Sequence, residues 1–236
     1  MEETMINENF INDNQLKAYL RILGVLSIIL FAIIPFQAAV YFISPPPTTA
    51  IQYFTLFQKN LFLGFLDLDL SLTVDNLLFI LIYIGLYLLL EKTNRILVTI
   101  GLVFAIVSVT LYVISREALF SMLTLSNQYS VATHEIERAS IATIGQTMLT
   151  IFNGTCFNVS YFLGGINMIL FSIAMLKSDI FTKVTGWMGL LMGILMLVPP
   201  TAGKLGIILS FLSIIPLMPW LIIIAIRFFK LGKQNR

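Results

Sequence analysis

Long apolar runs dominate this sequence and restrict what it can fold into. The first run, Ile22 to Ile43, has 22 residues and no charged side chain, and about 20 apolar residues are enough to cross a bilayer as a helix. Hydrophobic residues make up 58% of the 236-residue chain and charged residues only 11%. A soluble domain carries roughly 25% charged residues. The sequence therefore predicts an integral membrane protein. Its net charge of +2 gives no reason to expect a nucleic-acid partner.

Six apolar stretches separated by polar segments account for the chain. The predicted spans are 22–43, a stretch ending at 90 before the turn "EKTNR", 96–115, a stretch ending at 176, 184–198 and 207–226. The predicted fold class is an all-α membrane protein, built as a bundle of six transmembrane helices. We expect one transmembrane domain over residues 22–230, with tails at 1–21 and 231–236.

The lysine and arginine residues are divided unequally between the two sides of this bundle. Four lie on one side: Lys59, Arg116, Arg138 and Lys204. Ten lie on the other side: Lys17, Arg21, Lys92, Arg95, Lys177, Lys183, Arg227, Lys230, Lys233 and Arg236. Short cytoplasmic loops carry the excess of positive charge. The sequence therefore predicts a protein of the cytoplasmic membrane with both termini in the cytoplasm.

Two outer segments, 44–60 and 116–152, are longer than turns. The second contains "THEIERASIATIGQTML", in which Ile136, Ser140, Ile144 and Met148 follow one helical ridge and acidic residues occupy the first turn. Acidic residues favour a helix N-terminus, and Thr133 is a suitable cap. We expect an amphipathic cap helix here, between the third and fourth spans, lying over the outer ends of the bundle.

Three aspartates interrupt the apolar sequence in "LDLDLSLTVDN", residues 66–76. Counting 20 residues back from Leu90 places Asp67 and Asp69 at or outside the outer boundary, and Asp75 about 6 Å inside it. Either the segment is one helix with two polar stripes, or "LDLDL" is extended and the helix starts near Asp69 or Ser71.

Other polar residues fall at the same predicted depth. The candidate outer polar cluster consists of Asp67, Asp69, Asp75, Asn76, Arg116, Asn158 and Lys204. We expect Arg116 to be the counter-charge of Asp75, because both lie close to the same boundary. The cluster has three interpretations: ion pairs and caps that lock the helix ends, a site for a polar ligand or ion, or unrelated surface charges.

Small residues predict close helix packing within the membrane. Gly186, Gly189 and Gly193 lie along the fifth span, and Gly164 lies in the fourth. Glycines spaced in this way allow membrane helices to approach closely. We expect the fourth and fifth spans to pack together at these positions.

Signatures of catalysis and of metal or cofactor binding are missing from the sequence. One histidine and one cysteine make the usual zinc sites improbable, and no P-loop or paired nucleophile and base is present. We expect a protein that is not an enzyme and needs no cofactor.

The segments "LFLGFLDLDLSLTVDNLLFILIYIGLYLLL", "LFSMLTLSNQYSVAT", "IFNGTCFNVSYFLGGI" and "DIFTKVTGWMGLLMGI" occur in this order, with "IAIRFFKLG" near the end. In these segments the chain resembles a family of prokaryotic membrane proteins known as domain of unknown function 4386. The resemblance implies a six-helix membrane protein and carries over no site or activity.

Two functions remain open at this stage. The first is a non-enzymatic structural, sensory or accessory role in the membrane, with the lipid bilayer and a membrane-protein partner or a second copy as contacts. The second is transport of a small solute or ion through a polar site at the outer end of the bundle. A transporter usually binds its substrate near the midplane, where Asn167 is the most central polar side chain in the sequence.

Overall fold

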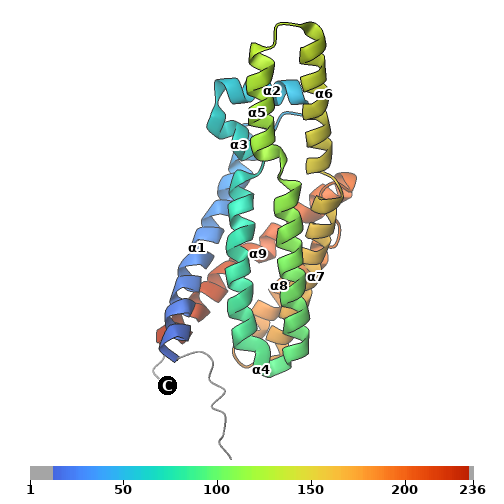
Figure 1. Cartoon of the computed structure of the whole chain (residues 1–236). Helices are drawn as coiled ribbons and strands as arrows, with labels where there is room; N and C mark the ends of the chain where they lie inside the picture. The colour runs from blue at the N-terminus through green and yellow to red at the C-terminus, as the bar shows by residue number, and fades with distance from the viewer. Residues whose placement is uncertain (1–12, 234–236) are drawn as a thin grey trace, which may run out of the picture.

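The computed structural model describes residues 13–233, and this part of the chain consists of helices without strands (Figure 1). Residues 1–12 and 234–236, which belong to the two predicted tails, lie outside the described residues. The helices are α1 (Asp13–Ile43), α2 (Ala50–Lys59), α3 (Leu61–Asp67), α4 (Leu70–Ser115), α5 (Ala118–Val131), α6 (Glu135–Phe152), α7 (Thr155–Lys177), α8 (Lys183–Leu195) and α9 (Gly203–Lys233).

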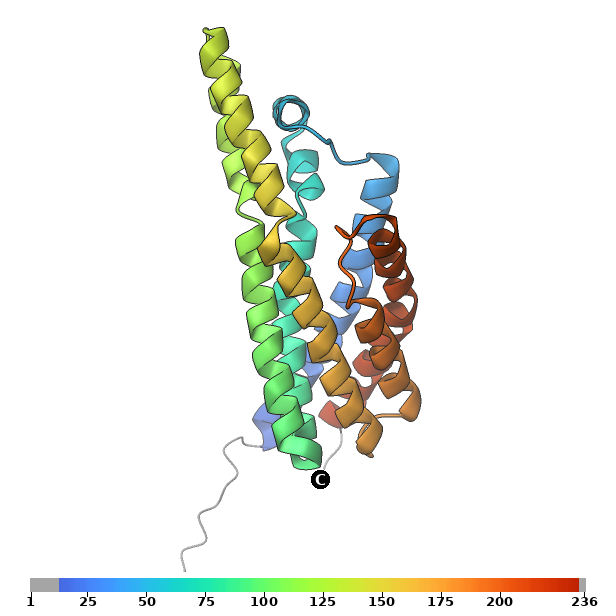
Figure 2. The same ribbon diagram turned by 90° about the vertical axis from the view of Figure 1, so that its right-hand side faces the viewer.

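Helix α4 consists of two antiparallel parts that lie side by side (Figures 1 and 2). Asn94, where they meet, has non-helical angles, with φ −159° and ψ 86°. The Asn94 side chain accepts a 3.1 Å hydrogen bond from the Leu97 N–H, as a cap does at the start of a helix. The chain thus reverses inside the polar segment "EKTNR", where the sequence predicts a turn.

Four helical stretches in the described part of the chain are long and apolar enough to cross a membrane. They are Asn14–Ile43, Leu70–Val131, Glu135–Lys177 and Gly203–Lys233. Helix α8 is apolar but has only 13 residues. Large apolar side chains such as Ile96, Trp187 and Ile215 face outward. Apolar surface of this extent is typical of a protein that is covered by lipid.

The start of α1 and the end of α9 lie at the same end of the bundle, which we call the proximal end (Figure 1). There the Arg21 Nε donates a 2.9 Å hydrogen bond to the Gly232 carbonyl. Above this contact, Leu23, Leu86, Phe171 and Trp220 belong to one buried hydrophobic core shared by α1, α4, α7 and α9. These side chains form the main hydrophobic core of the bundle.

Helices α7 and α8 approach each other so closely that a side chain would not fit at several of the glycine positions between them. A Cβ on Gly165 would lie 2.8 Å from the Gly193 carbonyl oxygen, and a Cβ on Gly193 would lie 2.8 Å from that of Gly165. Gly186 faces Leu176, and Gly189 faces Ser172 in the same interface. A Cβ on Gly164 would instead meet the Ser108 Oγ of α4 at 3.3 Å.

The opposite, distal end carries a second hydrophobic core. It is formed by α2, α3, α5 and α6, together called the distal module, and includes Phe54, Phe57, Met122 and Leu149. Hydrogen bonds also join its helices: the Ser126 hydroxyl donates to the Phe54 carbonyl at 2.9 Å. The module projects beyond the bundle as the α5–α6 hairpin, with α2 crossing beside it (Figure 2).

The helix expected within 116–152 is present as α6, but its orientation and buried face differ from the expectation. Figures 1 and 2 show α6 continuing the direction of α7 away from the bundle instead of lying across its end. Its buried residues are Ile141, Gly145, Leu149 and Phe152, whereas Ile136 on the predicted ridge is 84% exposed. Gly145 explains the buried face, because a Cβ there would lie only 2.7 Å from the Phe54 ring of α2.

Candidate functional site

Asp69 occupies the break between α3 and α4 in a left-handed backbone conformation. With φ 63° and ψ 31°, it is the one non-glycine residue with positive φ in the described part of the chain. Aspartate tolerates this region better than most residues do. The Asp69 carbonyl accepts hydrogen bonds from the Thr73 N–H and the Thr73 hydroxyl, both at 2.8 Å. Helix α4 therefore starts directly after Asp69, and the preceding residues are helical as α3 and not extended.

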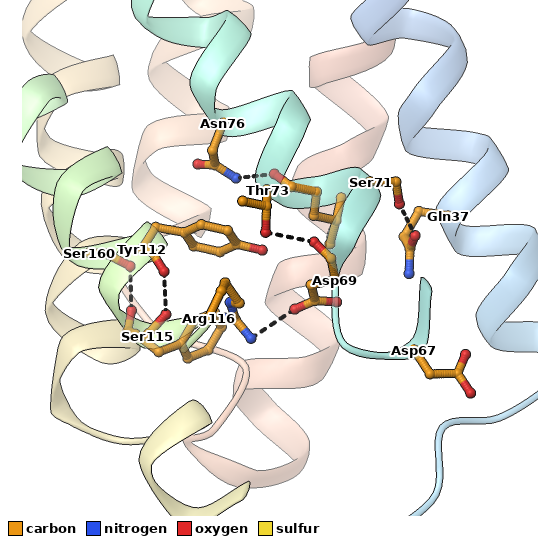
Figure 3. Close-up of polar contacts among 12 residues, drawn as sticks. Gln37, Asp67, Asp69, Ser71, Thr73, Asn76, Tyr112, Ser115, Arg116 and Ser160 are labelled. Carbon is orange, nitrogen blue, oxygen red and sulfur yellow. Dashed lines mark hydrogen bonds and ion pairs between the residues drawn. The ribbon is translucent and has the colours of Figure 1, made fainter. Parts of the chain in front are cut away.

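The buried Asp69 carboxylate contacts two residues that are distant in the sequence. Its Oδ2 lies 2.9 Å from the Arg116 Nη1 in a salt bridge (Figure 3), and its Oδ1 accepts a hydrogen bond from the Tyr41 hydroxyl of α1. Asp69 is 7% exposed and Arg116 is 3% exposed. The expectation that Asp75 pairs with Arg116 is therefore wrong. The break after α3 brings Asp69, not Asp75, to the distal end of α4.

Three aromatic rings enclose the Arg116 guanidinium. Its central carbon lies 3.8 Å from the ring centroid of Phe152, 4.5 Å from that of Tyr112 and 4.6 Å from that of Phe157. Cations are attracted to the faces of aromatic rings, more strongly away from water. Nε and Nη2 of Arg116 have no hydrogen-bond partner among the described residues, so these rings are the main neighbours on that side. Arg116 thus joins the ends of α4, α6 and α7.

Asp67, the last residue of α3, is buried without a counter-charge. It is 3% exposed, and neither carboxylate oxygen has a hydrogen-bond partner in the described structure. Its backbone carbonyl accepts a 3.1 Å hydrogen bond from the Tyr53 hydroxyl of α2. Burial raises the pKa of Asp67 to about 6, because an ionised group loses its hydration there. Burial also raises the pKa of Asp69, and the neighbouring Arg116 opposes that rise.

Asp75 and Asn167 are buried deeper in the bundle. Asp75 is 5% exposed and Asn167 is 1% exposed, and one side-chain oxygen of each has no hydrogen-bond partner among the described atoms. Asn167 lies midway along α7, on the face that contacts Tyr83 of α4. Buried polar atoms of native proteins are nearly always satisfied, so these two residues require an explanation.

The other members of the predicted polar cluster lie apart from the salt bridge. Asn76 donates to the Leu72 carbonyl of its own helix at 2.9 Å. Asn158 donates to the Gly154 carbonyl at 2.8 Å and accepts a hydrogen bond from the Thr201 hydroxyl. Lys204 is exposed at the start of α9. None of these three residues forms a hydrogen bond or a salt bridge with Asp69 in the described part of the chain.

Helix α1 also contributes to this site, which was not predicted from the sequence. Besides Tyr41, the buried Gln37 donates a 3.1 Å hydrogen bond to the Leu66 carbonyl and accepts one from the Ser71 hydroxyl (Figure 3). Gln37 thereby ties the end of α3 to the start of α4. Two polar residues four positions apart, near the end of an apolar run, were the available signal.

A comparison with family models matches residues 22–231 to the family described as Domain of unknown function (DUF4386). The chain belongs to this family. No curated protein and no solved structure matches the chain.

The chemistry available to this DUF4386 protein follows from its buried carboxylates. The described residues include no group of three or more His, Cys, Asp or Glu side chains that could hold a metal ion. Asp69 is neutralised by Arg116, whereas Asp67 and Asp75 have no salt-bridge partner in the described part of the chain. The arrangement can therefore lock helix ends through Asp69 and bind protons at the two unpaired carboxylates.

Proposed function

We propose that this DUF4386 protein is a non-enzymatic, six-span protein of the cytoplasmic membrane with a sensory or accessory role on the outer face. The spans are α1, the two parts of α4, α7, α8 and α9. The termini are cytoplasmic, and the distal module lies outside. The unequal distribution of lysine and arginine supports this orientation.

The observation that carries the proposal is the position of the Asp69–Arg116 salt bridge between the distal module and the spans. Asp69 follows the module helix α3, and Arg116 precedes the module helix α5. Through Tyr41 and Phe157 the same two side chains contact α1 and α7. A displacement of the module would therefore move the distal ends of three spanning elements. This coupling suits a protein that reports an event outside the membrane.

The tip of the α5–α6 hairpin has features that suit the binding of a partner outside the bilayer. Val131 is 76% exposed and Ile136 is 84% exposed on either side of the turn. Exposed apolar residues at the end of a projecting element suit contact with another protein. The proposed contacts are therefore the lipid bilayer around the spans, and a membrane-protein partner or a second copy at the tip.

The test is complementation of a deletion of the coding sequence in the native host, scored by growth under envelope stress. Variants are compared at equal amounts in the membrane. Val131→Ser with Ile136→Ser should fail to restore growth, and the control Thr143→Ala, also exposed on α6, should restore it. Full restoration by the tip variant would contradict the proposal.

Transport of a small solute or ion is the second candidate, favoured by the unpaired oxygens of Asp75 and Asn167 inside the bundle. Polar groups within a membrane often mark the path of a substrate or ion. Transport predicts the opposite complementation pattern: Asn167→Leu should fail, and the tip variant should restore growth.

A further inference from the structure

Asp75 belongs to a ridge of α4 that faces α7. Asp75, Phe79 and Tyr83 follow one another at intervals of four residues, so they lie on one side of the helix. The ring centroids of Phe79 and Tyr83 are 5.8 Å apart, and Tyr83 stacks on Phe171 of α7 at 5.6 Å. Tyr83 also faces Asn167 of α7. The Asp75 side chain therefore lies on the face of α4 that packs against α7.

The second part of α4 closes this space from another side. Asp75 lies near the hydroxyl groups of both Tyr83 and Tyr112. Tyr112 in turn lies 6.2 Å from Phe157 of α7, measured between ring centroids. Asp75 is thus surrounded by the two parts of α4 and by α7. It lies five residues beyond the start of α4, which is roughly 8 Å along the helix.

No positive charge is available to Asp75 in the described structure. Arg116, which follows the second part of α4, forms its salt bridge with Asp69. The other ionisable groups that face this space are Tyr83 and Tyr112 of α4, with Tyr41 of α1 bonded to Asp69 beyond them. From α7 the polar neighbour is the uncharged Asn167. An ionised carboxylate in this setting would be desolvated and unpaired, which is strongly unfavourable.

Protonation removes that charge and supplies a hydrogen-bond donor. A protonated carboxyl has one O–H and can still accept hydrogen bonds. Metal cations fit the surroundings poorly, since hard cations such as Ca²⁺ take six to eight oxygen ligands. The described residues offer no group of three carboxylate, imidazole or thiolate side chains for a metal.

We propose that Asp75 is a proton-binding site within the membrane, loaded from the distal side and held between the two parts of α4 and α7. One proton from water adds to the carboxylate to give the neutral acid, and no other bond changes. Asp75 lies along α4 beyond the salt bridge of Asp69, and Asn167 lies midway along the neighbouring helix α7. The site is separate from the distal module and does not depend on its role.

Infrared difference spectroscopy of the purified full-length protein tests this site. At about pH 7.5 an ordinary aspartate is ionised, so a carboxylic acid C=O band that shifts in D₂O reports an unusual protonated group. The band should be present in the wild type and absent from Asp75→Asn. It should persist in Asp67→Asn and in Asp179→Asn, the latter an exposed aspartate between α7 and α8.

Two further measurements keep the result decisive. In Asp75→Glu the band should return at a shifted frequency, which shows that the carboxyl group at this position carries the proton. Raising the sodium concentration should leave the wild-type band unchanged. A wild type without the band, a band that survives Asp75→Asn, or a band that sodium abolishes would overturn the proposal. Loss of the band in sodium would show that Asp75 binds a sodium ion rather than a proton.

Discussion

Arg116 and Asp69 form a 2.9 Å salt bridge at the point where the distal module joins the bundle. Both side chains are almost fully buried, so each depends on the other for compensation of its charge. Removing one member of a buried pair typically costs roughly 3–5 kcal/mol, because the remaining charge stays buried and unpaired. The pair also contacts two other helices: Tyr41 of α1 donates a hydrogen bond to Asp69, and the ring of Phe152 of α6 lies against Arg116.

The aromatic enclosure of Arg116 should be measurable. Phe152→Leu removes the nearest ring, at 3.8 Å from the guanidinium carbon, and should lower stability by about 1–2 kcal/mol through the cation–ring attraction and lost packing. The apparent melting temperature in detergent should therefore fall. Phe162→Leu is the matched control, because Phe162 is an exposed phenylalanine of α7. Equal melting temperatures for the two variants would show that the rings around Arg116 add nothing.

Asp67 should make stability depend on pH in an unusual direction. Burial raises the pKa of Asp67 from 3.8 to about 6, so the ionisation of Asp67 is less favourable in the folded protein than in the unfolded chain. Because Asp67 ionises first in the unfolded chain, its contribution to stability is largest below about pH 4 and is lost as the pH rises toward 6. Asp67→Asn should reduce this fall in stability and raise the apparent melting temperature at about pH 7.5. Thermal scans across this range, with Asp179→Asn as control, test the expectation. A wild type whose stability rises between pH 4 and 6 would argue against a buried, unpaired Asp67.

The contact between α7 and α8 should be intolerant of a single methyl group. In Gly165→Ala the new Cβ would lie 2.8 Å from the Gly193 carbonyl oxygen and 3.1 Å from the Met196 backbone. Backbone atoms cannot move aside cheaply, so we expect a loss of about 1–3 kcal/mol. Gly164→Ala is a close control, since its Cβ meets the Ser108 hydroxyl at 3.3 Å. Equal melting temperatures for the two alanine variants would show that the close approach is not rigid.

The membrane character and the order of the helices could be predicted from the sequence because both depend on local composition. Apolar runs can be recognised directly in the sequence, and the charged segment "EKTNR" marks the turn between two of them. The partner of Arg116 could not be predicted in this way. Counting residues along one regular helix places Asp75, and not Asp69, inside the membrane. The left-handed conformation of Asp69 breaks that helix, so a count along a single helix does not show which aspartate meets Arg116. The salt bridge between Asp69 and Arg116 forms where α1, both parts of α4 and α6 pack together, and this packing cannot be seen in the local sequence.

The distal module shows the same limit. A helix over 135–152 was predictable from its charge pattern, whereas its buried face was not. Ile136 and Ile144 are apolar but exposed, whereas the face through Ile141 and Gly145 is buried. The face that contains Gly145 is buried because α2 packs against it. Nothing in the sequence around Gly145 indicates that α2 lies there.

The proposed orientation places the hairpin outside the cell. In a Cys156→Ala background, single cysteines at Ser130 and at Lys233 put one thiol on the hairpin and one near the end of α9, both at exposed positions. An impermeant thiol reagent added to intact cells should label position 130 and not 233, and permeabilised cells should show labelling at both. Labelling of 233 alone in intact cells would mean that the protein is inverted.

The coupling between Asp69 and Arg116 is measured most directly by a double-mutant cycle in the purified protein, using Asp69→Asn, Arg116→Gln and their combination. Each single variant should lose roughly 3–5 kcal/mol. The double variant should lose clearly less than the sum, with an interaction energy of about 1–3 kcal/mol. The parallel cycle of Asp75→Asn with Arg116→Gln should be additive. Additive losses for Asp69 and Arg116, together with coupling between Asp75 and Arg116, would contradict the account of this junction.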